Sequence, residues 1–367
     1  MSSTPPPPST RALEEARQRL DRELAKHPED AKLLLLRGRA DERLERYEDA
    51  AAFFQRAAKV LRAEGDRAGE AAAVLEAASA YGRAGDFSRA RLLFVRAVST
   101  FEELPDAVGA GRARAAYARM LLDDGQAADA EEQLRLCVGA LEQGEVWDTL
   151  GWAQERLVQL ALAADDLEGA LAAARSAVES AARAKDRPRF GAGLAQVARL
   201  HLASGNWGKA RQYQERALPY LREAEAWVPL LEGYLMLIDG ELAEGGVDRT
   251  EALIGEATEV ADRVRKPMFQ GRLRVRSGEV LLLRGDPARA RALLQQGVEL
   301  LQRAGDLRSS APAFEALGRA QWRLGDRDAA LVALDRAAWM HRQLGDAERA
   351  ADVEAVRANA ASGAWKG

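Results

Sequence analysis

The sequence contains a single cysteine, Cys137, so no disulfide bond can form within the chain. Its longest apolar run, from Val228 to Ile238, is interrupted by Glu232 and Gly233 and is too short to span a bilayer. No basic, apolar, small-residue export signal is recognisable before the first expected helix. These absences predict a reduced, soluble, cytoplasmic protein.

Aromatic residues are also scarce, and basic residues do not outnumber acidic ones. Aromatics are 6% of the chain, and the formal net charge is −4, so no overall basic field attracts nucleic acid or a membrane surface. Ala, Leu, Arg and Glu are abundant instead, with opposite charges finely interspersed, as in stacked amphipathic helices. At 367 residues the chain exceeds the usual size of one compact core, so a helical repeat array is favoured.

Helix-breaking residues recur at a fixed interval of 40 positions, at Gly85, Gly125, Asp165, Gly205, Gly245, Gly285 and Gly325. A second set lies about half a period away, at Gly65, Pro105, Gly144, Asp186, Gly305 and Gly345. Gly accepts the left-handed conformation that ends a helix, and Asp or Asn then caps the next helix. Each repeat is therefore predicted to be a hairpin of two helices.

Small residues follow each 40-residue turn in two columns. The first small column contains Ala50, Ala90, Ala130, Ala170, Ala210, Thr250, Ala290 and Ala330. The second small column, seven positions later, contains Ala57, Ala97, Cys137, Ala177, Ala217, Ala257, Gly297 and Ala337. Because a spacing of seven places two residues on one helical face, this face can press closely against a neighbouring helix.

Mostly large apolar residues lie between the two small columns. This apolar column contains Phe54, Phe94, Leu134, Ala174, Gln214, Ile254, Leu294 and Leu334. These side chains are expected to fill the space between neighbouring helices. Gln214 is the exception, and the adjacent Tyr213 is a candidate to replace it in the core.

Two repeats illustrate the pattern. The second shows it at Tyr81, Gly85, Asp86, Phe87, Ala90, Phe94 and Ala97, and the eighth at Phe314, Leu317, Gly318, Ala330 and Ala337. This pattern resembles the tetratricopeptide repeat (TPR), in an extended variant with a period of 40 instead of about 34 and with the closing Pro mostly absent. HEAT-type repeats have a similar period, but the Gly-Asp turn and the Ala, Phe, Ala spacing favour the TPR.

The resemblance implies an all-α, right-handed superhelical solenoid of about eight hairpins. The repeats are expected near residues 31–66, 67–106, 107–146, 147–186, 187–226, 227–266, 267–306 and 307–346. Capping helices are expected at 10–26, as part of a truncated repeat with Ala16 and Leu20, and at 347–360. Residues 1–9 are predicted to be a disordered Pro-rich arm, and 361–367 a flexible tail, with docking of Trp365 as the alternative.

Residues with catalytic or metal-binding chemistry are dispersed. His27, His201 and His341 fall in different repeats, with no ligand at metal-site spacing, and His201 is expected to be a packed core residue. Cys137 is expected to be buried in the second small column. Gly205 to Lys209 lacks the Ser or Thr of a phosphate-binding loop. No catalytic, cofactor-binding or metal-binding residue is therefore predicted, and the chain is not expected to be an enzyme.

The TPR resemblance also implies a groove lined by the first helix of every repeat. The candidate partner-binding residues on this groove are Arg39, Arg112, Arg119, Trp152, Gln159, Arg199, Arg272, Arg319 and Trp322. Because Arg binds carboxylates with a planar fork of donors, the groove is a candidate site for an acidic segment. Asp239 and Glu279 interrupt the Arg positions, so a mixed surface is the alternative.

These observations predict a protein–protein interaction scaffold or adaptor that binds a partner protein or peptide in its groove. The alternative is a regulatory TPR sensor whose curvature changes when a peptide or small ligand binds. An RNA-binding or enzyme-accessory array is disfavoured by the net negative charge.

Overall fold

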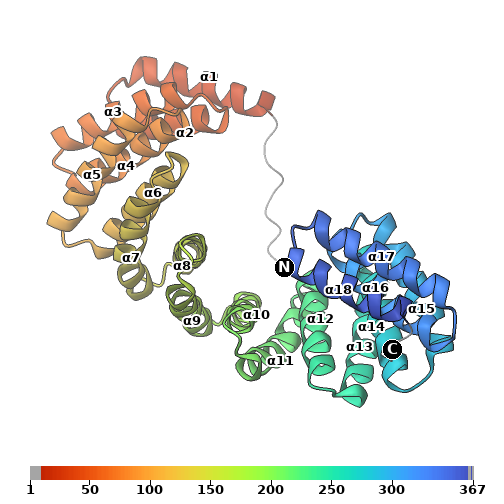
Figure 1. Ribbon diagram of the computed structural model, residues 1–367. Coiled ribbons are helices and arrows are strands. Elements are labelled where there is room, and N and C mark those ends of the chain that lie inside the picture. Colours follow the sequence, from red (N-terminus) through yellow and green to blue (C-terminus); the bar gives the residue numbers. More distant parts are fainter. Residues whose placement is uncertain (1–9, 363–364, 366–367) are drawn as a thin grey trace. The chain divides into compact units, whose positions relative to one another are not determined.

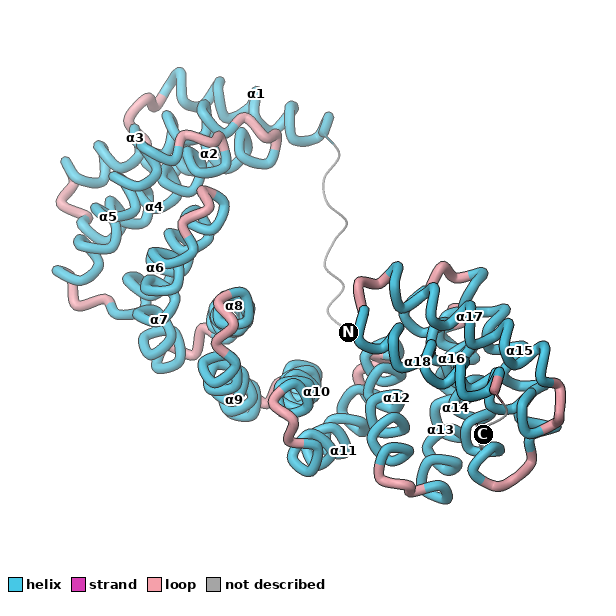
Figure 2. Tube along the Cα trace, viewed as in Figure 1, coloured by secondary structure: helices cyan, strands magenta, loops and turns pink. Residues whose placement is uncertain are grey.

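The computed structural model describes residues 10–362 and 365 of the chain, and all regular secondary structure in this part is helical (Figures 1 and 2). The helices are α1 Thr10–Lys26, α2 Ala31–Arg43, α3 Tyr47–Ala63, α4 Arg67–Arg83, α5 Phe87–Glu103, α6 Ala107–Asp123, α7 Ala127–Gln143, α8 Trp147–Ala163, α9 Leu167–Arg183, α10 Arg187–Ala203, α11 Trp207–Glu223, α12 Trp227–Ala243, α13 Val247–Val264, α14 Pro267–Leu283, α15 Pro287–Arg303, α16 Leu307–Arg323, α17 Arg327–Gln343 and α18 Ala347–Ala361. Consecutive helices pack as pairs, so the predicted all-α array of TPR-like hairpins is confirmed. The Pro-rich arm expected at residues 1–9 lies outside the described residues.

The turns follow a stricter rule than the sequence predicts. The backbone takes a positive φ at every twentieth residue from Glu45 to Gly345. At the half-period turns the left-handed residue is Glu145 instead of Gly144, and Lys185 instead of Asp186. Asp and Asn side chains then accept the backbone N–H three residues further on, at Asp66, Asp86, Asp106, Asp166, Asn206, Asp286, Asp306, Asp326 and Asp346. The predicted capping is therefore present at most turns.

The chain forms two compact units, Met1–Asp186 and Arg187–Gly367. Within the first unit, α4 contacts α6 and α6 contacts α8 in addition to the hairpin pairs. Within the second, α10 contacts α12, α12 contacts α14, and α14 contacts α16. Even-numbered helices thus contact one another along each unit, from α4 to α8 in the first and from α10 to α16 in the second. The first helix of each hairpin is even-numbered. We call the surface of α2, α4, α6 and α8 the first-helix face of the first unit, and the surface of α10, α12, α14 and α16 the first-helix face of the second.

The two small columns lie in the core as predicted, and so does the apolar column except for Ile254, which is half-buried. Every residue of the first small column has 0% of its surface exposed. The second small column is buried except for Ala177, which is half-buried. In the apolar column, Phe54 packs directly on Gly38, where a Cβ atom would lie 2.6 Å from Cε1 of the ring. In this hairpin the two helices therefore approach closely at a small residue.

Gln214 itself occupies the core position of its repeat. It is only 1% exposed, whereas the ring of Tyr213 lies outside the core position and stacks on His201 with a centroid separation of 5.5 Å. Tyr213 therefore does not replace Gln214 in the apolar column, contrary to the expectation from the sequence. His201 is buried, as expected for a packed core histidine.

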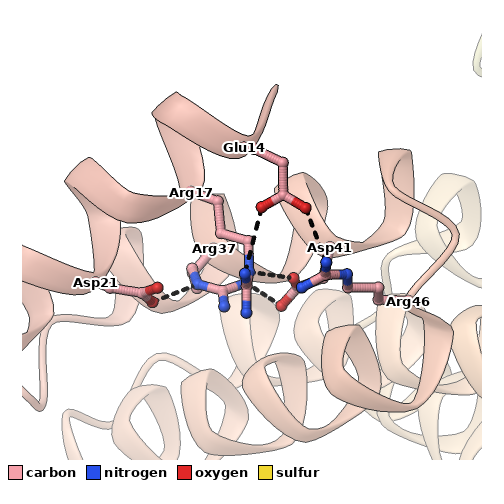
Figure 3. Close-up of polar contacts among 6 residues, drawn as sticks. All are labelled: Glu14, Arg17, Asp21, Arg37, Asp41 and Arg46. Carbon is pink, nitrogen blue, oxygen red and sulfur yellow. Dashed lines mark hydrogen bonds and ion pairs between the residues drawn. The ribbon is translucent and has the colours of Figure 1, made fainter. Parts of the chain in front are cut away.

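The N-terminal helix α1 buries only one of its residues, Leu24, and charged groups also join it to the first hairpin. The ion cluster that joins it to the first hairpin consists of Glu14, Arg17, Asp21, Arg37, Asp41 and Arg46 (Figure 3). Arg37 and Asp41 are buried and paired with each other. Arg37 Nε also donates to Asp21 Oδ1 at 2.6 Å, and Arg17 Nε donates to Asp41 Oδ1 at 3.2 Å.

At the other end, Trp365 packs against α16. Its ring centroid lies 5.2 Å from that of Trp322, and Trp322 Nε1 donates to the carbonyl oxygen of Trp365 at 3.2 Å. This is the docked arrangement that the sequence left as the alternative to a flexible tail. Residues 363–364 and 366–367 lie outside the described residues.

Candidate functional site

All nine predicted groove residues lie on even-numbered helices. Arg39 is on α2, Arg112 and Arg119 are on α6, and Trp152 and Gln159 are on α8; Arg199 is on α10, Arg272 on α14, and Arg319 and Trp322 on α16. Most of them are exposed, and Trp152, Arg272 and Trp322 are half-buried. Their geometry divides them into smaller groups.

In the first unit, α6 and α8 bring two predicted residues together. The guanidinium carbon of Arg119 lies 4.5 Å from the centroid of the Trp152 ring, a cation–π contact. Elsewhere in this unit, Arg39 Nη2 is 3.3 Å from Glu76 Oε1. Arg39 also lines a cavity of about 620 Å³ between α1 and α2, together with Leu13, Leu20 and Leu36.

In the second unit, Arg199 and Arg272 line one cavity of about 770 Å³, which we call the α12 cavity. Pro229, Glu232 and Met236 of α12 also line it. Arg199 Nη1 lies 4.0 Å from Glu232 Oε2, so this pair is loose. The cavity has the mixed character of a binding site, with apolar walls and a few charged groups at its edge.

Arg319 lines a second, smaller cavity of about 370 Å³ in the same unit. There, Arg276 Nε donates to Asp239 Oδ1 and Arg276 Nη1 donates to Glu279 Oε2, both at 2.7 Å. Asp239 and Glu279, the acidic residues that interrupt the predicted Arg positions, are therefore both paired with Arg276. Trp322, the predicted apolar anchor, is partly covered by Trp365.

Most of the residues that line the α12 cavity were not predicted as site residues, among them Trp207, Gln214 and Met236. Trp207 and Gln214 belong to α11, a second helix, whereas the TPR resemblance directs attention to first helices. Gln214 did carry a signal, because it is a polar residue in an otherwise apolar column. Trp207 follows a turn, and nothing in its spacing indicates that it lines a cavity.

The single thiol lies in the core of the first unit. Cys137 is 0% exposed, its Sγ lies 3.1 Å from the carbonyl oxygen of Leu134, and burial raises its pKa to about 11. A thiol with this pKa carries almost no thiolate at pH 8, so it is a poor nucleophile. Within residues 10–362 and 365, no group of three or more His, Cys, Asp and Glu side chains is placed to hold a metal ion.

Cys137 is accordingly expected to resist alkylation in the folded protein. With excess iodoacetamide at pH 8, labelling should be at least about 100-fold slower than in 6 M guanidinium chloride, because both thiolate formation and access require opening of the helix pair. Intact-mass spectrometry over time measures the rate. Labelling of the native chain at the denatured rate would contradict the buried placement.

Crossing a bilayer would require a longer and more apolar helix than any in the described part of the chain. The hairpins, their turns and the first-helix face define an all-α, TPR-like repeat protein. No protein-family model and no curated protein matches the sequence.

Several solved helical proteins are similar in fold. Aspartyl phosphate phosphatase F from Bacillus subtilis is 13% identical, with 92% of this chain and 91% of that chain covered and a TM-score of 0.46. A Rap protein in complex with competence and sporulation factor is 16% identical, with 92% and 96% covered and a TM-score of 0.42. BtubC from P. vanneervenii is 12% identical, with 59% and 91% covered and a TM-score of 0.47. Identities and TM-scores this low carry no argument about function.

Proposed function

We propose that the chain is a non-catalytic scaffold or adaptor that binds a partner protein or peptide on its first-helix face. The observation that carries this proposal is the α12 cavity, where Arg199 and Arg272 meet apolar side chains on one face of the second unit. Interfaces gain affinity from aromatic and arginine anchors seated in such pockets. The Arg119–Trp152 pair offers an anchor of the same kind in the first unit.

Charge reversal on this face tests the proposal. The combined variant Arg119→Glu and Arg199→Glu is expected to weaken capture of a partner with an acidic segment at least tenfold, because two attractive contacts become repulsive. The measurement is quantitative affinity capture of tagged full-length chain from its native lysate. The matched control is Arg135→Glu with Arg303→Glu, which makes the same charge change on the exposed, odd-numbered α7 and α15. Equal loss of partners in the test variant and in the control variant would contradict the proposal. Retention of every partner by the test variant would also contradict it.

The second candidate function, a sensor of a peptide or small ligand, is favoured by one feature. The α12 cavity is lined by α10 and α11 of one hairpin and α12 of the next, so a bound molecule would touch both. A ligand that binds one hairpin angle better than another shifts the population towards that angle. Small-angle scattering distinguishes the two functions, since a sensor changes its radius of gyration on ligand addition and a static adaptor does not.

A further inference from the structure

Two residues of α11 that line the α12 cavity each carry a buried N–H donor without an acceptor. Gln214 Nε2 and Trp207 Nε1 are both buried, and neither has a hydrogen-bond partner among the described residues. The whole Gln214 residue is only 1% exposed. Buried donors are normally paired in folded proteins, so two unpaired donors in one cavity call for a physical explanation.

A specific fit between α11 and α12 places these donors. A Cβ atom on Gly233 would lie 2.0 Å from Gln214 Nε2, and one on Gly240 would lie 2.2 Å from the Trp207 ring. Gln214 and Trp207 are seven residues apart on α11, as are Gly233 and Gly240 on α12, so each pair lies on one face of its helix.

The same positions in other repeats are filled differently. The position of Gly240 carries Ala40, Ala80, Met120, Leu160, Leu200, Val280 and Ala320. The position of Gln214 is elsewhere Phe, Leu, Ile or Ala. The contact between α11 of one repeat and α12 of the next thus departs from the rest of the array, because it has less apolar packing and contains two unpaired donors. An acceptor that arrives with a ligand would satisfy them.

One of the two arginines that line the cavity has no ion-pair partner among the described residues. Arg199 lies 4.0 Å from Glu232, and Arg276 pairs with Asp239 at 2.7 Å. Arg211 lies 3.1 Å from Glu241 and 3.7 Å from Glu244. Arg272 has no ion-pair partner within residues 10–362 and 365. A carboxylate on the occupant would therefore meet an available guanidinium.

The remaining walls are apolar and adaptable. Leu202 of α10 and Pro229 and Met236 of α12 line the cavity, and Met accommodates varied apolar side chains because its thioether chain is flexible. The volume of about 770 Å³ is in the range of sites that hold a few residues or a drug-sized molecule.

We propose that the α12 cavity binds an apolar peptide segment that carries an adjacent carboxylate. The apolar side chain packs against Met236, Pro229 and Leu202. Oxygen atoms of the segment accept hydrogen bonds from Gln214 and Trp207, and the carboxylate pairs with Arg272. This rests on the proposed function, because it names the class of segment that the second unit binds.

The test uses fluorescein-labelled octapeptides with a central Phe-Leu or Leu-Phe pair, flanked by Glu on one or both sides. Fluorescence anisotropy with the full-length chain should show binding of at least one Glu-flanked peptide. Replacing its Glu by Lys, or its apolar pair by Ser, should weaken binding at least tenfold. Failure of every Glu-flanked peptide to bind the wild-type chain, or equal binding of the Lys-flanked peptides, would overturn the proposal.

Variants of α11 identify the donors. Gln214→Leu introduces the residue found at this position in three other repeats, so the fold should keep or raise its melting temperature while peptide affinity falls about tenfold. Trp207→Phe keeps a ring and removes the N–H, and should weaken binding about three- to tenfold. Gln212→Leu makes the same change as Gln214→Leu at an exposed position of α11 and should leave affinity unchanged.

Unchanged peptide affinity in both Gln214→Leu and Trp207→Phe would show that the two N–H groups are only structural and would overturn their assignment. The proposed function is judged separately. If charge reversal of Arg119 and Arg199 abolishes partner capture while no octapeptide binds, the scaffold function stands and the peptide class assigned to the α12 cavity falls.

Discussion

Asp41→Ala is expected to destabilise the first hairpin by about 3 kcal/mol, the lower end for breaking a buried ion pair. Arg37 would stay buried without its closest partner, and only the half-exposed Asp21 would still accept from it. Arg17 of α1 would lose its contact with α2 at the same time. Hydrogen exchange followed by mass spectrometry should show faster exchange across α1 and α2, with the second unit unaffected.

The controls separate charge from packing. Burial raises the pKa of the Asp41 carboxyl although Arg37 and Arg17 oppose that rise, so desolvation outweighs the pairing. Replacing both partners, as Arg37→Met with Asp41→Leu, should therefore leave stability within about 1 kcal/mol of the wild type. If Asp41→Ala left exchange unchanged, or if the double variant were as unstable as the single one, the ion cluster would not be what holds α1.

The periodic features of the fold were predictable where one residue type recurs at one backbone position. Gly85 and Gly325 end helices in the left-handed conformation that Gly accepts at least cost. Glu225 and Arg265 take the same conformation without any turn signal in their side chains. At these two positions the residue type does not favour a positive φ, so the turn could not be predicted from local propensity.

The ion cluster was not predictable, because its members are dispersed over α1, α2 and the following turn. Arg17 and Asp41 are 24 residues apart, and many other Arg and Asp residues offer the same chemistry. The sequence indicated a capping helix over 10–26 from its Ala and Leu spacing. In the structure, Arg17 and Asp21 of this helix pair with Asp41 and Arg37 of α2. These pairs can be identified only from the distances between the side chains.

The candidate site was predictable in part. The nine groove residues do lie on first helices, because helical periodicity fixes which residues share a face. Which of them act together depends on how closely neighbouring helices approach. The Gly233 and Gly240 positions, where α11 side chains reach α12, decide this for the α12 cavity. Glycine in a helix interior signals close approach, but the sequence does not name the partner helix.

Phe54→Ala is expected to cost about 3–5 kcal/mol in the first unit, because a fully buried ring is removed and a cavity remains. Since each repeat contacts only its neighbours, the loss should stay within α2 to α5. Phe54→Leu, with the residue that three other repeats carry, should cost less than about 1.5 kcal/mol. Region-resolved hydrogen exchange measures both, and protection of α2 and α3 equal to wild type in Phe54→Ala would contradict the packing described.

The partner of Phe54 makes the prediction sharper. Gly38 lies in the interior of α2, where Gly→Ala alone would stabilise a helix by about 0.5–1 kcal/mol. In the wild-type background the added Cβ would meet the Phe54 ring at 2.6 Å, so Gly38→Ala should destabilise the hairpin. In the Phe54→Ala background that clash is absent, and the same substitution should become stabilising. A double-mutant cycle measures this reversal of sign, whereas additive effects would show that the ring does not press on Gly38.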